Sequence, residues 1–282
     1  TPEQRQAALA KAADARREGG VFLSDACARD RRLVVCAAGD RATVTAVENR
    51  LTNPFLAQRL PEVLPENPMH WAAAWLDEAA RQCVQRNPNS MTLATVGSDQ
   101  QPSARIVLCK DFAPDPGYLV FFTNYNSRKV AELRANPQVA VTFHWDALGR
   151  QVRIEGTAVF SPAGESDAYF ATRDRGSQLG AWGSDQSAPL SSREALLRQL
   201  QERARDLGLN VSDDLQSIES VDRAAIPRPD HWGGVRVWAS AVELWIEGRD
   251  RIHDRARWLR TLEESGANDF AAGKWKGTRL QP

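Results

Sequence analysis

Short apolar runs separated by turn residues fill most of the chain from residue 91 onward. The runs over 91–96 and 103–108 flank a polar turn from Gly97 to Pro102, which is the pattern of a β-hairpin. Many short strands divided by turn signals favour an antiparallel sheet that closes, or nearly closes, into a barrel. Similar runs predict further strands over 118–124, 138–145, 150–160, 235–240, 241–246, 251–260 and 275–280.

Helical patterns occur singly between these strands. Trp71, Trp75 and Ala79 share one face of an amphipathic helix predicted over 69–83. Strands and helices do not alternate strictly, and no glycine-rich phosphate-loop signature occurs, which argues against doubly wound nucleotide-binding folds. The predicted fold class is therefore mainly β with inserted helices (α+β). The other helices of this part are predicted over 127–135, from 161 onward and over 191–207.

Composition divides the chain into three parts. Residues 1–52 form an N-terminal extension of unknown role, in which we expect a helix over 3–18 and then a hairpin turning at Gly39-Asp40. A proline-rich connector covers 53–68, and the main domain is predicted over 69–282. Within that domain, residues 208–225 are expected to be an insertion of unknown role, without regular structure around 212–222.

Charge and cysteine content restrict the possible partners. Lys plus Arg and Asp plus Glu each number 36, so net charge gives no reason to expect nucleic acid or an anionic membrane. The four cysteines lack C-x-x-C or zinc-type spacing, and we expect reduced thiols and no metal site. No apolar run approaches a membrane span and no signal peptide is visible, so we expect a cytoplasmic protein. The first residue is Thr, which leaves N-terminal processing open.

Cations nevertheless gather at particular places. Extended backbone in R-I-H-D-R would place Arg251, His253 and Arg255 on one face, which requires an anionic partner unless the segment is a solvated edge strand. The segment N-S-R-K places Arg128 and Lys129 at a helix start, where the backbone amides and the helix dipole favour an anion. A plain solvated first turn fits the same four residues.

Further polar residues supply groups that a phosphorylated ring compound needs. Arg105 lies on the second strand of the predicted hairpin, and Lys110 lies at its end. Gln151, Gln186 and Ser187 offer neutral donors and acceptors for the edge of a heteroaromatic ring. Each feature is weak by itself.

A series of motifs connects these separate features. They are A-R-I-V-L-C-K (104–110), F-F-T-N (121–124), S-R-K (127–129), R-Q-V-R-I-E-G (150–156), Y-F-A-T-R (169–173), S-Q-L-G-A-W-G-S-D-Q-S (177–187), W-G-G (232–234), R-I-H-D-R (251–255) and W-K-G-T-R-L-Q-P (275–282). With these motifs, the sequence from about 65 to 282 resembles the pyridoxine/pyridoxamine 5′-phosphate oxidase family.

The resemblance implies an antiparallel FMN-binding split β-barrel and a homodimer with FMN sites at the interface. It also implies oxidation of pyridoxamine and pyridoxine 5′-phosphate to pyridoxal 5′-phosphate, with hydride passing from C4′ to FMN N5 and O2 reoxidising the flavin to give H2O2.

The resemblance implies roles for individual residues. Arg251 and His253 would close over the substrate as the catalytic pair, orienting it more than acting as obligatory acid and base, although a structural role for His253 stays open. The substrate phosphate would be bound by Lys110, Tyr169, Arg173 and Ser177. FMN would be bound by residues matching Arg105, Ile106, Val107, Leu108, Lys110, Phe122, Thr123, Arg128, Lys129, Gln151, Gln186, Ser187, Trp245 and Arg255.

One segment departs from the family pattern and keeps alternatives open. Family members often carry an Arg- and Tyr-containing N-terminal segment over the substrate, whereas here only Arg50 and Arg59 offer similar chemistry. A related flavin enzyme acting on another ring, of the phenazine type, is therefore an alternative, although the phosphate-binding set argues against it. A non-catalytic FMN- or pyridoxal-phosphate-binding protein is a second alternative. An RNA-binding barrel is a third, and it lacks the aromatic and basic strips of such modules.

Overall fold

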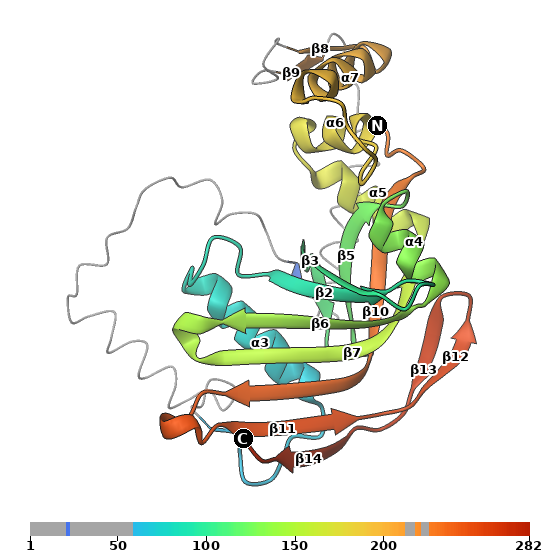
Figure 1. Ribbon diagram of the computed structural model, residues 1–282. Helices are drawn as coiled ribbons and strands as arrows, with labels where there is room; N and C mark the ends of the chain where they lie inside the picture. Colours follow the sequence, from blue (N-terminus) through green and yellow to red (C-terminus); the bar gives the residue numbers. More distant parts are fainter. Residues whose placement is uncertain (1–20, 23–58, 212–217, 221–225) are drawn as a thin grey trace, which may run out of the picture.

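A computed structural model describes residues 21–22, 59–211, 218–220 and 226–282 of the chain. Its centre is one ten-stranded antiparallel sheet that curls around a hydrophobic core (Figure 1). The strand order is β1-β4-β5-β10-β7-β6-β2-β3, and β11 and β14 continue the sheet from β10. Among the described strands β3 pairs only with β2, so the sheet forms a split barrel and not a closed one.

The predicted strands from residue 91 onward are largely confirmed, and several elements are added. The sheet contains β1 (Val21–Phe22), β2 (Ser90–Val96), β3 (Pro102–Leu108), β4 (Asp111–Ala113), β5 (Tyr118–Asn124), β6 (Gln138–Trp145), β7 (Arg150–Phe160), β10 (Trp232–Ile246), β11 (Asp254–Leu259) and β14 (Lys276–Leu280). Two small hairpins pair β8 (Leu209–Val211) with β9 (Ile218–Ser220) and β12 (Leu262–Gly266) with β13 (Asp269–Ala272). The helices are α3 (Pro68–Arg81), α4 (Arg128–Ala135), α5 (Ala163–Thr172), α6 (Arg175–Gly183) and α7 (Arg193–Asp206), with 3-10 turns η3 (Asp146–Leu148) and η4 (Arg249–Arg251).

The long strand β10 organises the sheet. Its first half pairs with β5, its second half pairs with β11, and β7 runs beside both halves. The register shifts between Ala239 and Ala241, so Ser240 forms a bulge that bends the strand. Gly156 lies opposite this bulge, where a Cβ would stand 1.9 Å from the Trp238 carbonyl oxygen, so only glycine fits. The two strands predicted over 235–240 and 241–246 are therefore one bent strand.

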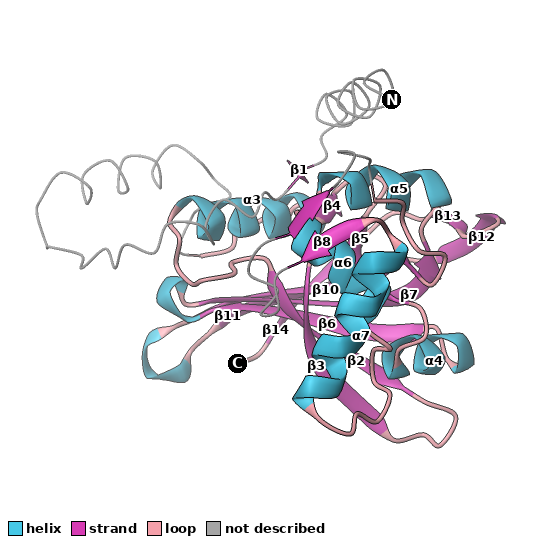
Figure 2. Cartoon of the chain, turned by 90° about the horizontal axis from the view of Figure 1, so that it is seen from above, coloured by secondary structure: helices cyan, strands magenta, loops and turns pink. Residues whose placement is uncertain are grey.

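Helix α3 covers one face of the curled sheet (Figure 2). Asn67 caps its start by accepting a hydrogen bond from the Met69 amide, and Pro68, which was assigned to the connector, occupies the first turn. Trp71 and Trp75 are buried and meet edge to face with ring centroids 6.4 Å apart. The helix predicted over 69–83 is thus confirmed, shifted by one residue at its start.

The C-terminal strands hold the end of the connector. The Leu60 amide donates to Asp254 (2.7 Å), and the Trp258 indole nitrogen donates to the Pro65 carbonyl (2.8 Å). Leu60 itself is buried in the main core. Residues 60–65 therefore pack on β11, while the helix expected over 3–18 and the hairpin at Gly39-Asp40 lie outside the described residues.

The region after β7 is more helical than the sequence pattern indicates. The helix predicted from Ser161 is confirmed as α5, and α7 confirms the helix predicted over 191–207. Between them, α6 was not predicted; Asp174 caps it by accepting from the Ser177 amide at 2.8 Å. The stretch 212–222, expected to be irregular, contains β9, and its other residues are outside the described part of the chain.

Candidate active site

The first turn of α4 presents two cations beside backbone amides. Asn124, the last residue of β5, accepts a hydrogen bond from the Asn126 amide (2.8 Å), which stabilises the turn into the helix. Ser127 is the N-cap but makes no side-chain capping bond, and the Arg128 amide donates to Ser187 Oγ instead (3.2 Å). Arg128 and Lys129 consequently stand at the positive end of the helix dipole.

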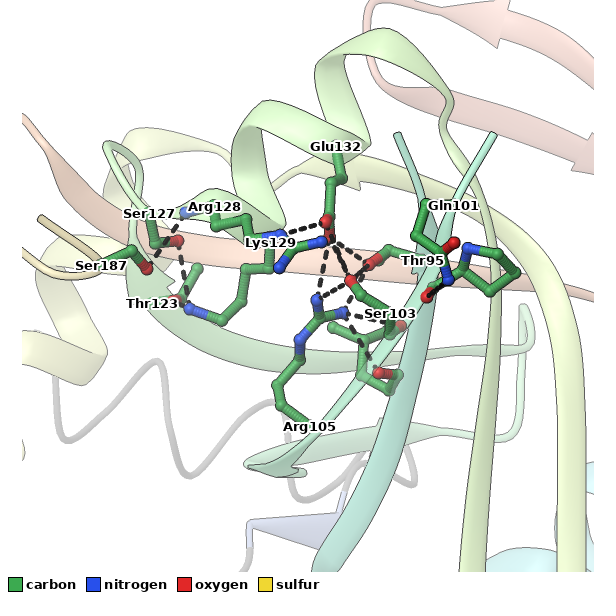
Figure 3. A network of polar contacts seen from close by, with 12 residues as sticks. Thr95, Gln101, Ser103, Arg105, Thr123, Ser127, Arg128, Lys129, Glu132 and Ser187 are labelled. Carbon is green, nitrogen blue, oxygen red and sulfur yellow. Dashed lines mark hydrogen bonds and ion pairs between the residues drawn. The ribbon is translucent and has the colours of Figure 1, made fainter. Parts of the chain in front are cut away.

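Arg105 and Arg128 both bind one carboxylate, and Lys129 lies beside them with its amine directed to Thr123 and Ser127 (Figure 3). We call these three residues the α4 cation cluster. Glu132 accepts from Arg105 Nη2 and from Arg128 Nε, both at 2.8 Å. Hydroxyl groups of Thr95 and Ser103 donate to the same carboxylate at 2.5 and 2.8 Å. Strands β2 and β3 and helix α4 are thereby joined at a single acidic side chain.

The environment of the cluster shifts two pKa values. Burial by itself would raise the pKa of Glu132, but hydrogen bonds from Thr95, Ser103, Arg128 and Arg105 lower it to about 2. Burial, with the nearby charge of Arg105, lowers the pKa of Lys129 to about 8, against the opposing effect of Glu132. Glu132 is therefore a carboxylate at neutral pH, and Lys129 titrates close to the physiological range.

A loop after α6 completes this side of the site. Lys129 Nζ donates to Gln186 Oε1 (2.6 Å) and to Thr123 Oγ1 (3.0 Å). Ser187 Oγ accepts from the Arg128 amide. The loop and the helix start line an open hollow of about 300 Å³. The lining residues are Asn126, Arg128, Asp185, Gln186, Ser187 and Ala188.

A second group, here called the Tyr169 cluster, consists of Lys110, Tyr169, Arg173 and Ser177. Lys110 is almost buried and its Nζ lies 5.9 Å from the centre of the Tyr169 ring. The Arg173 guanidinium lies 4.6 Å from the Trp232 ring. Ser177 Oγ donates to Asp174 Oδ2 (2.9 Å). Lys110 and Arg173 thus approach the Tyr169 and Trp232 rings, and Ser177 lies beside Asp174 at the start of α6.

Strand β5 lies between the α4 cation cluster and the Tyr169 cluster, and two neighbouring residues of the strand contact one cluster each. Phe122 stacks on Tyr169 with ring centroids 4.0 Å apart and an interplanar angle of 15°. Its neighbour Thr123 contacts the other side, where it meets Lys129 and Gln186. Successive side chains on a strand point to opposite faces, so β5 serves both clusters.

A third group lies at the far end of β10. The strand register aligns Gln151, Trp245 and Arg255 directly across β7, β10 and β11. The His253 ring contacts the Trp245 ring at 4.6 Å between centroids, and the Gly248 amide donates to His253 Nδ1 (3.2 Å). In its neutral form this imidazole therefore carries its proton on Nε2. Arg255 pairs with Glu243 at 2.8 Å.

The R-I-H-D-R segment is not the continuous strand that its alternation predicts. Arg251 ends the turn η4, and both Asp250 and Arg251 have left-handed backbone, with φ of 57° and 64°. Strand β11 begins only at Asp254. The predicted common face of Arg251, His253 and Arg255 is therefore wrong, although His253 and Arg255 both approach Trp245 through different contacts.

The remaining residues implied for FMN lie along β3. Ile106 is largely exposed, Val107 packs partly against the main core, and Leu108 is half-buried. Arg105 on the same strand directs its guanidinium to Glu132, Thr95 and Ser103. The two clusters beside β5 and this strand form one region, and the Gln151–Trp245–Arg255 row forms another.

Comparison with known proteins decides the family. Residues 76–204 match the family model described as pyridoxamine 5′-phosphate oxidase, and residues 232–282 match the pyridoxine 5′-phosphate oxidase C-terminal dimerisation region. A pyridoxine/pyridoxamine 5′-phosphate oxidase of Rubrobacter xylanophilus is 41% identical over 244 residues, covering 86% of this chain and 99% of the relative. The chain belongs to the pyridoxine/pyridoxamine 5′-phosphate oxidase family. A Caulobacter vibrioides family member is 40% identical over 253 residues, covering 90% of this chain and 99% of its own.

Solved structures bear out the split-barrel fold of this oxidase family member. PhzG from Burkholderia lata, in complex with tetrahydrophenazine-1-carboxylic acid, aligns with a TM-score of 0.63 and 27% identity. That alignment covers 77% of this chain and 94% of PhzG. An FMN-binding protein from Nostoc punctiforme aligns with a TM-score of 0.52 at 14% identity, covering 78% and 99% of the two chains, and shares the fold.

Two features of this oxidase site were not predicted from sequence. Glu132 was missed because its spacing from Arg128 also occurs in ordinary exposed helix pairs. Gln199 of α7 donates to the Gly183 carbonyl (2.8 Å) and to Asp185 (3.2 Å), so it holds the loop that carries Gln186 and Ser187. The i,i+4 spacing could have suggested Glu132, whereas no local signal identifies Gln199.

Proposed function

We propose that this protein oxidises pyridoxamine 5′-phosphate and pyridoxine 5′-phosphate to pyridoxal 5′-phosphate, with FMN as cofactor. The observation that carries the proposal is the pair of cationic clusters on either side of β5, in a chain about 40% identical to named oxidases over nearly their whole length. Each cluster offers charge and hydrogen-bond donors for one phosphate. One would bind the phosphate of the cofactor and the other that of the substrate.

The residues around α4 fit FMN. The helix start presents amides and cations beside an open hollow, an arrangement that binds a phosphate monoester. Gln186 and Thr123 add neutral groups next to the cations. The described part of the chain shows no dinucleotide-binding loop, so a mononucleotide suits the site better than FAD. When bound, FMN would supply a two-electron acceptor that O2 reoxidises with formation of H2O2.

The Tyr169 cluster fits the phosphate of the substrate. Lys110 is nearly buried, so a bound phosphate meets its charge in a poorly hydrated place, where charge-assisted hydrogen bonds are strong. Arg173 is held over the Trp232 ring, which limits its motion. The stacked Phe122 and Tyr169 rings would fix the position of the substrate relative to the cofactor.

Arg251 and His253 would orient the reacting end of the substrate. The Gly248 amide fixes the tautomer of His253, which therefore presents an Nε2–H donor while neutral. Arg251 is exposed at the tip of η4, where it is free of the sheet and able to meet an incoming ligand. Their expected role is positioning of the amine or alcohol carbon, with His253 Nε2–H as a hydrogen-bond donor.

A second copy of the chain would complete each site. Phe122 and Gly234 are register partners at one end of β10. Trp245 lies eleven residues farther on, a path of roughly 35 Å along the bent strand at the usual rise per residue. One chain therefore keeps Trp245, His253 and Arg255 far from the clusters beside β5. These three residues lie in the segment that matches a dimerisation region. Two-fold pairing would bring the two halves together in two equivalent sites.

A phenazine-type substrate is a second candidate because of the similarity to PhzG. It is the weaker one, because the cations Lys110 and Arg173 beside the Tyr169 and Trp232 rings suit a phosphorylated substrate better than one without phosphate. Neither proposal specifies where in the cell the protein is found. Among the described residues no helix has the length and apolar character needed to cross a membrane, and a cytoplasmic location stays a prediction.

The proposal is tested by the optical spectrum of the purified full chain. A flavin spectrum is expected, and it should bleach when pyridoxamine 5′-phosphate is added without oxygen and return when air is admitted. Pyridoxal 5′-phosphate should form in the same sample. A protein that binds FMN but bleaches only with a non-phosphorylated ring compound supports the phenazine-type alternative. A flavin that no such compound reduces supports a non-catalytic binding protein.

A further inference from the structure

Glu132 is an acidic side chain placed among cations that are expected to bind a phosphate. It is 8% exposed, whereas Arg128, its partner one turn earlier, is 62% exposed. An anion at this position repels a second anion, so electrostatic attraction alone does not explain it. Its contacts show what it does for the cations.

The carboxylate determines how both guanidiniums are held. Arg105 directs Nη1 to Thr95 and the Leu93 carbonyl and Nη2 to Ser103 and Glu132, so its head is fixed in one orientation. Arg128 gives Nε to Glu132, and the same side chain lines the open hollow. A flexible arginine loses side-chain entropy when it binds a ligand, and a partner that has already fixed it reduces that loss.

Glu132 also sets the charge of the site. The three cations and the Glu132 carboxylate sum to about two positive units, and the Asp185 carboxylate, which also lines the hollow, reduces this to about one. The site therefore keeps a net positive charge that favours a phosphate monoester. Hydrogen bonds from four side chains keep the Glu132 carboxylate ionised, with a pKa of about 2, so its negative charge persists over the physiological range, while the pKa of Lys129 is about 8. Removal of Glu132 would release the Arg128 guanidinium, leave Arg105 with Thr95, Ser103 and the Leu93 carbonyl, and remove the charge that offsets the repulsion between the two arginines.

We propose that Glu132 is a positioning residue for the cofactor phosphate: it holds Arg105 and Arg128 in the arrangement that binds a phosphate dianion. The inference rests on the proposed FMN site and goes beyond it by assigning a role to a residue that does not itself donate to the ligand. Two effects oppose each other when Glu132 is removed. The loss of fixed geometry outweighs the gain in attraction, because water screens charge at the exposed Arg128.

The test compares FMN with riboflavin, which is the same ring system without the phosphate. The full chain is freed of flavin, and binding is followed by quenching of flavin fluorescence for the wild type, Glu132→Ala and Glu132→Gln. Asp77→Ala is the matched control, because Asp77 and Arg81 form another helical ion pair of the same spacing class at 2.8 Å, away from the site. Glu132→Gln keeps the size and one acceptor oxygen.

We expect Glu132→Ala to weaken FMN binding about tenfold, the size of one charge-assisted hydrogen bond, and to leave riboflavin binding within about twofold. Glu132→Gln should fall between Glu132→Ala and the wild type, and Asp77→Ala should match the wild type for both ligands. If Glu132→Ala does not fold, the FMN-to-riboflavin affinity ratio of Glu132→Gln decides.

Three results would overturn the inference. An equal loss for both flavins would mean that Glu132 supports the fold of the site and not the phosphate contact. Tighter FMN binding would mean that it acts as a competing anion, and unchanged binding would mean that it has no role. Failure of the proposed function looks different, because the wild type itself would then show no preference for FMN over riboflavin.

Discussion

At the scale of single residues, the site is a set of cations held by fixed partners. Arg128 belongs to the α4 start, lines the hollow and is held through Nε by Glu132. Lys129 donates hydrogen bonds to both Thr123 and Gln186. Each would therefore make a distinct contribution to the proposed phosphate binding, which a substitution can isolate.

Loss of the Arg128 side chain should weaken FMN binding. We expect Arg128→Ala to reduce the binding free energy by about 1.5 kcal/mol, the low end for a charge-assisted hydrogen bond because the side chain is largely exposed. Arg81→Ala, which removes an exposed helical arginine on α3, is the control. Equilibrium titration with FMN measures both, and an unchanged dissociation constant for Arg128→Ala would show that the helix start does not bind the phosphate.

FMN binding should depend on pH through Lys129. Burial lowers the pKa of this amine to about 8, so it is charged below that pH and loses its charge above it. A bound phosphate prefers the charged amine, and FMN affinity should therefore be highest below about pH 8 and fall as pH rises, by at most about tenfold per unit. Lys129→Arg stays charged and should remove this step. A wild-type profile that stays flat from pH 7 to 10 contradicts the assignment.

We expect substitutions of Arg251, His253 and Arg255 to have different effects on FMN binding and on turnover. Arg251→Ala and His253→Ala should keep FMN, and Arg251→Ala should lower kcat/KM for pyridoxamine 5′-phosphate about 100-fold, or about 2.7 kcal/mol. His253→Ala should lose less, because Lys110 and Arg173 still position the phosphate. Arg255→Ala should loosen FMN instead. Release of FMN from Arg251→Ala, with retention in Arg255→Ala, would mean that the two roles are reversed.

At the scale of elements, α7 supports the proposed cofactor site through the loop after α6. Gln199 donates to the Gly183 carbonyl and to Asp185, so it joins the helix to the segment that carries Gln186 and Ser187. Gln199→Ala should weaken FMN by about 1 kcal/mol, one net hydrogen bond, without lowering kcat at saturating FMN. Glu202→Ala, an exposed change on the same helix, is the control. If both variants lost FMN affinity equally, the cause would be a general change in α7 and not the loss of the Gln199 hydrogen bonds.

Sequence patterns predict those elements whose burial alternates. Strand β2 shows strict alternation of buried and half-buried residues, and α3 buries one apolar face, so both were predicted. The β12–β13 hairpin is mostly exposed and has no such pattern. The turn η4 depends on left-handed backbone at Asp250 and Arg251, and neither residue is a glycine that would have signalled it.

Sequence analysis identified only those residues of the candidate site that lie within recognisable motifs. Arg128 and Lys129 follow from a helix start that is visible in the sequence. The role of Glu132 could not be predicted, because it depends on contacts with Thr95 on β2 and Ser103 on β3, which approach it only in the folded chain. The distance between Phe122 and Trp245 likewise follows from the register of β10 and not from any local pattern.

At the scale of the whole molecule, the structure keeps two halves of the proposed site at opposite ends of β10. The α4 cation cluster and the Tyr169 cluster lie at one end, and Trp245, His253 and Arg255 lie at the other. A two-fold dimer would join the first half of one chain to the second half of its partner. The oxidase activity would then belong to the dimer and not to the single chain.

Complementation between two inactive variants tests this central claim most directly. Lys110→Ala alters the first half of the site and Arg251→Ala alters the second half, so each homodimer carries one defect in both of its sites. When the two chains are co-expressed, half of the dimers are mixed, and each mixed dimer has one site without any substitution. Formation of pyridoxal 5′-phosphate should then recover to about a quarter of the wild-type rate, because random pairing restores one site in four. If both halves came from one chain, the mixture would show no more activity than the average of the two variants alone, and the shared site would be contradicted.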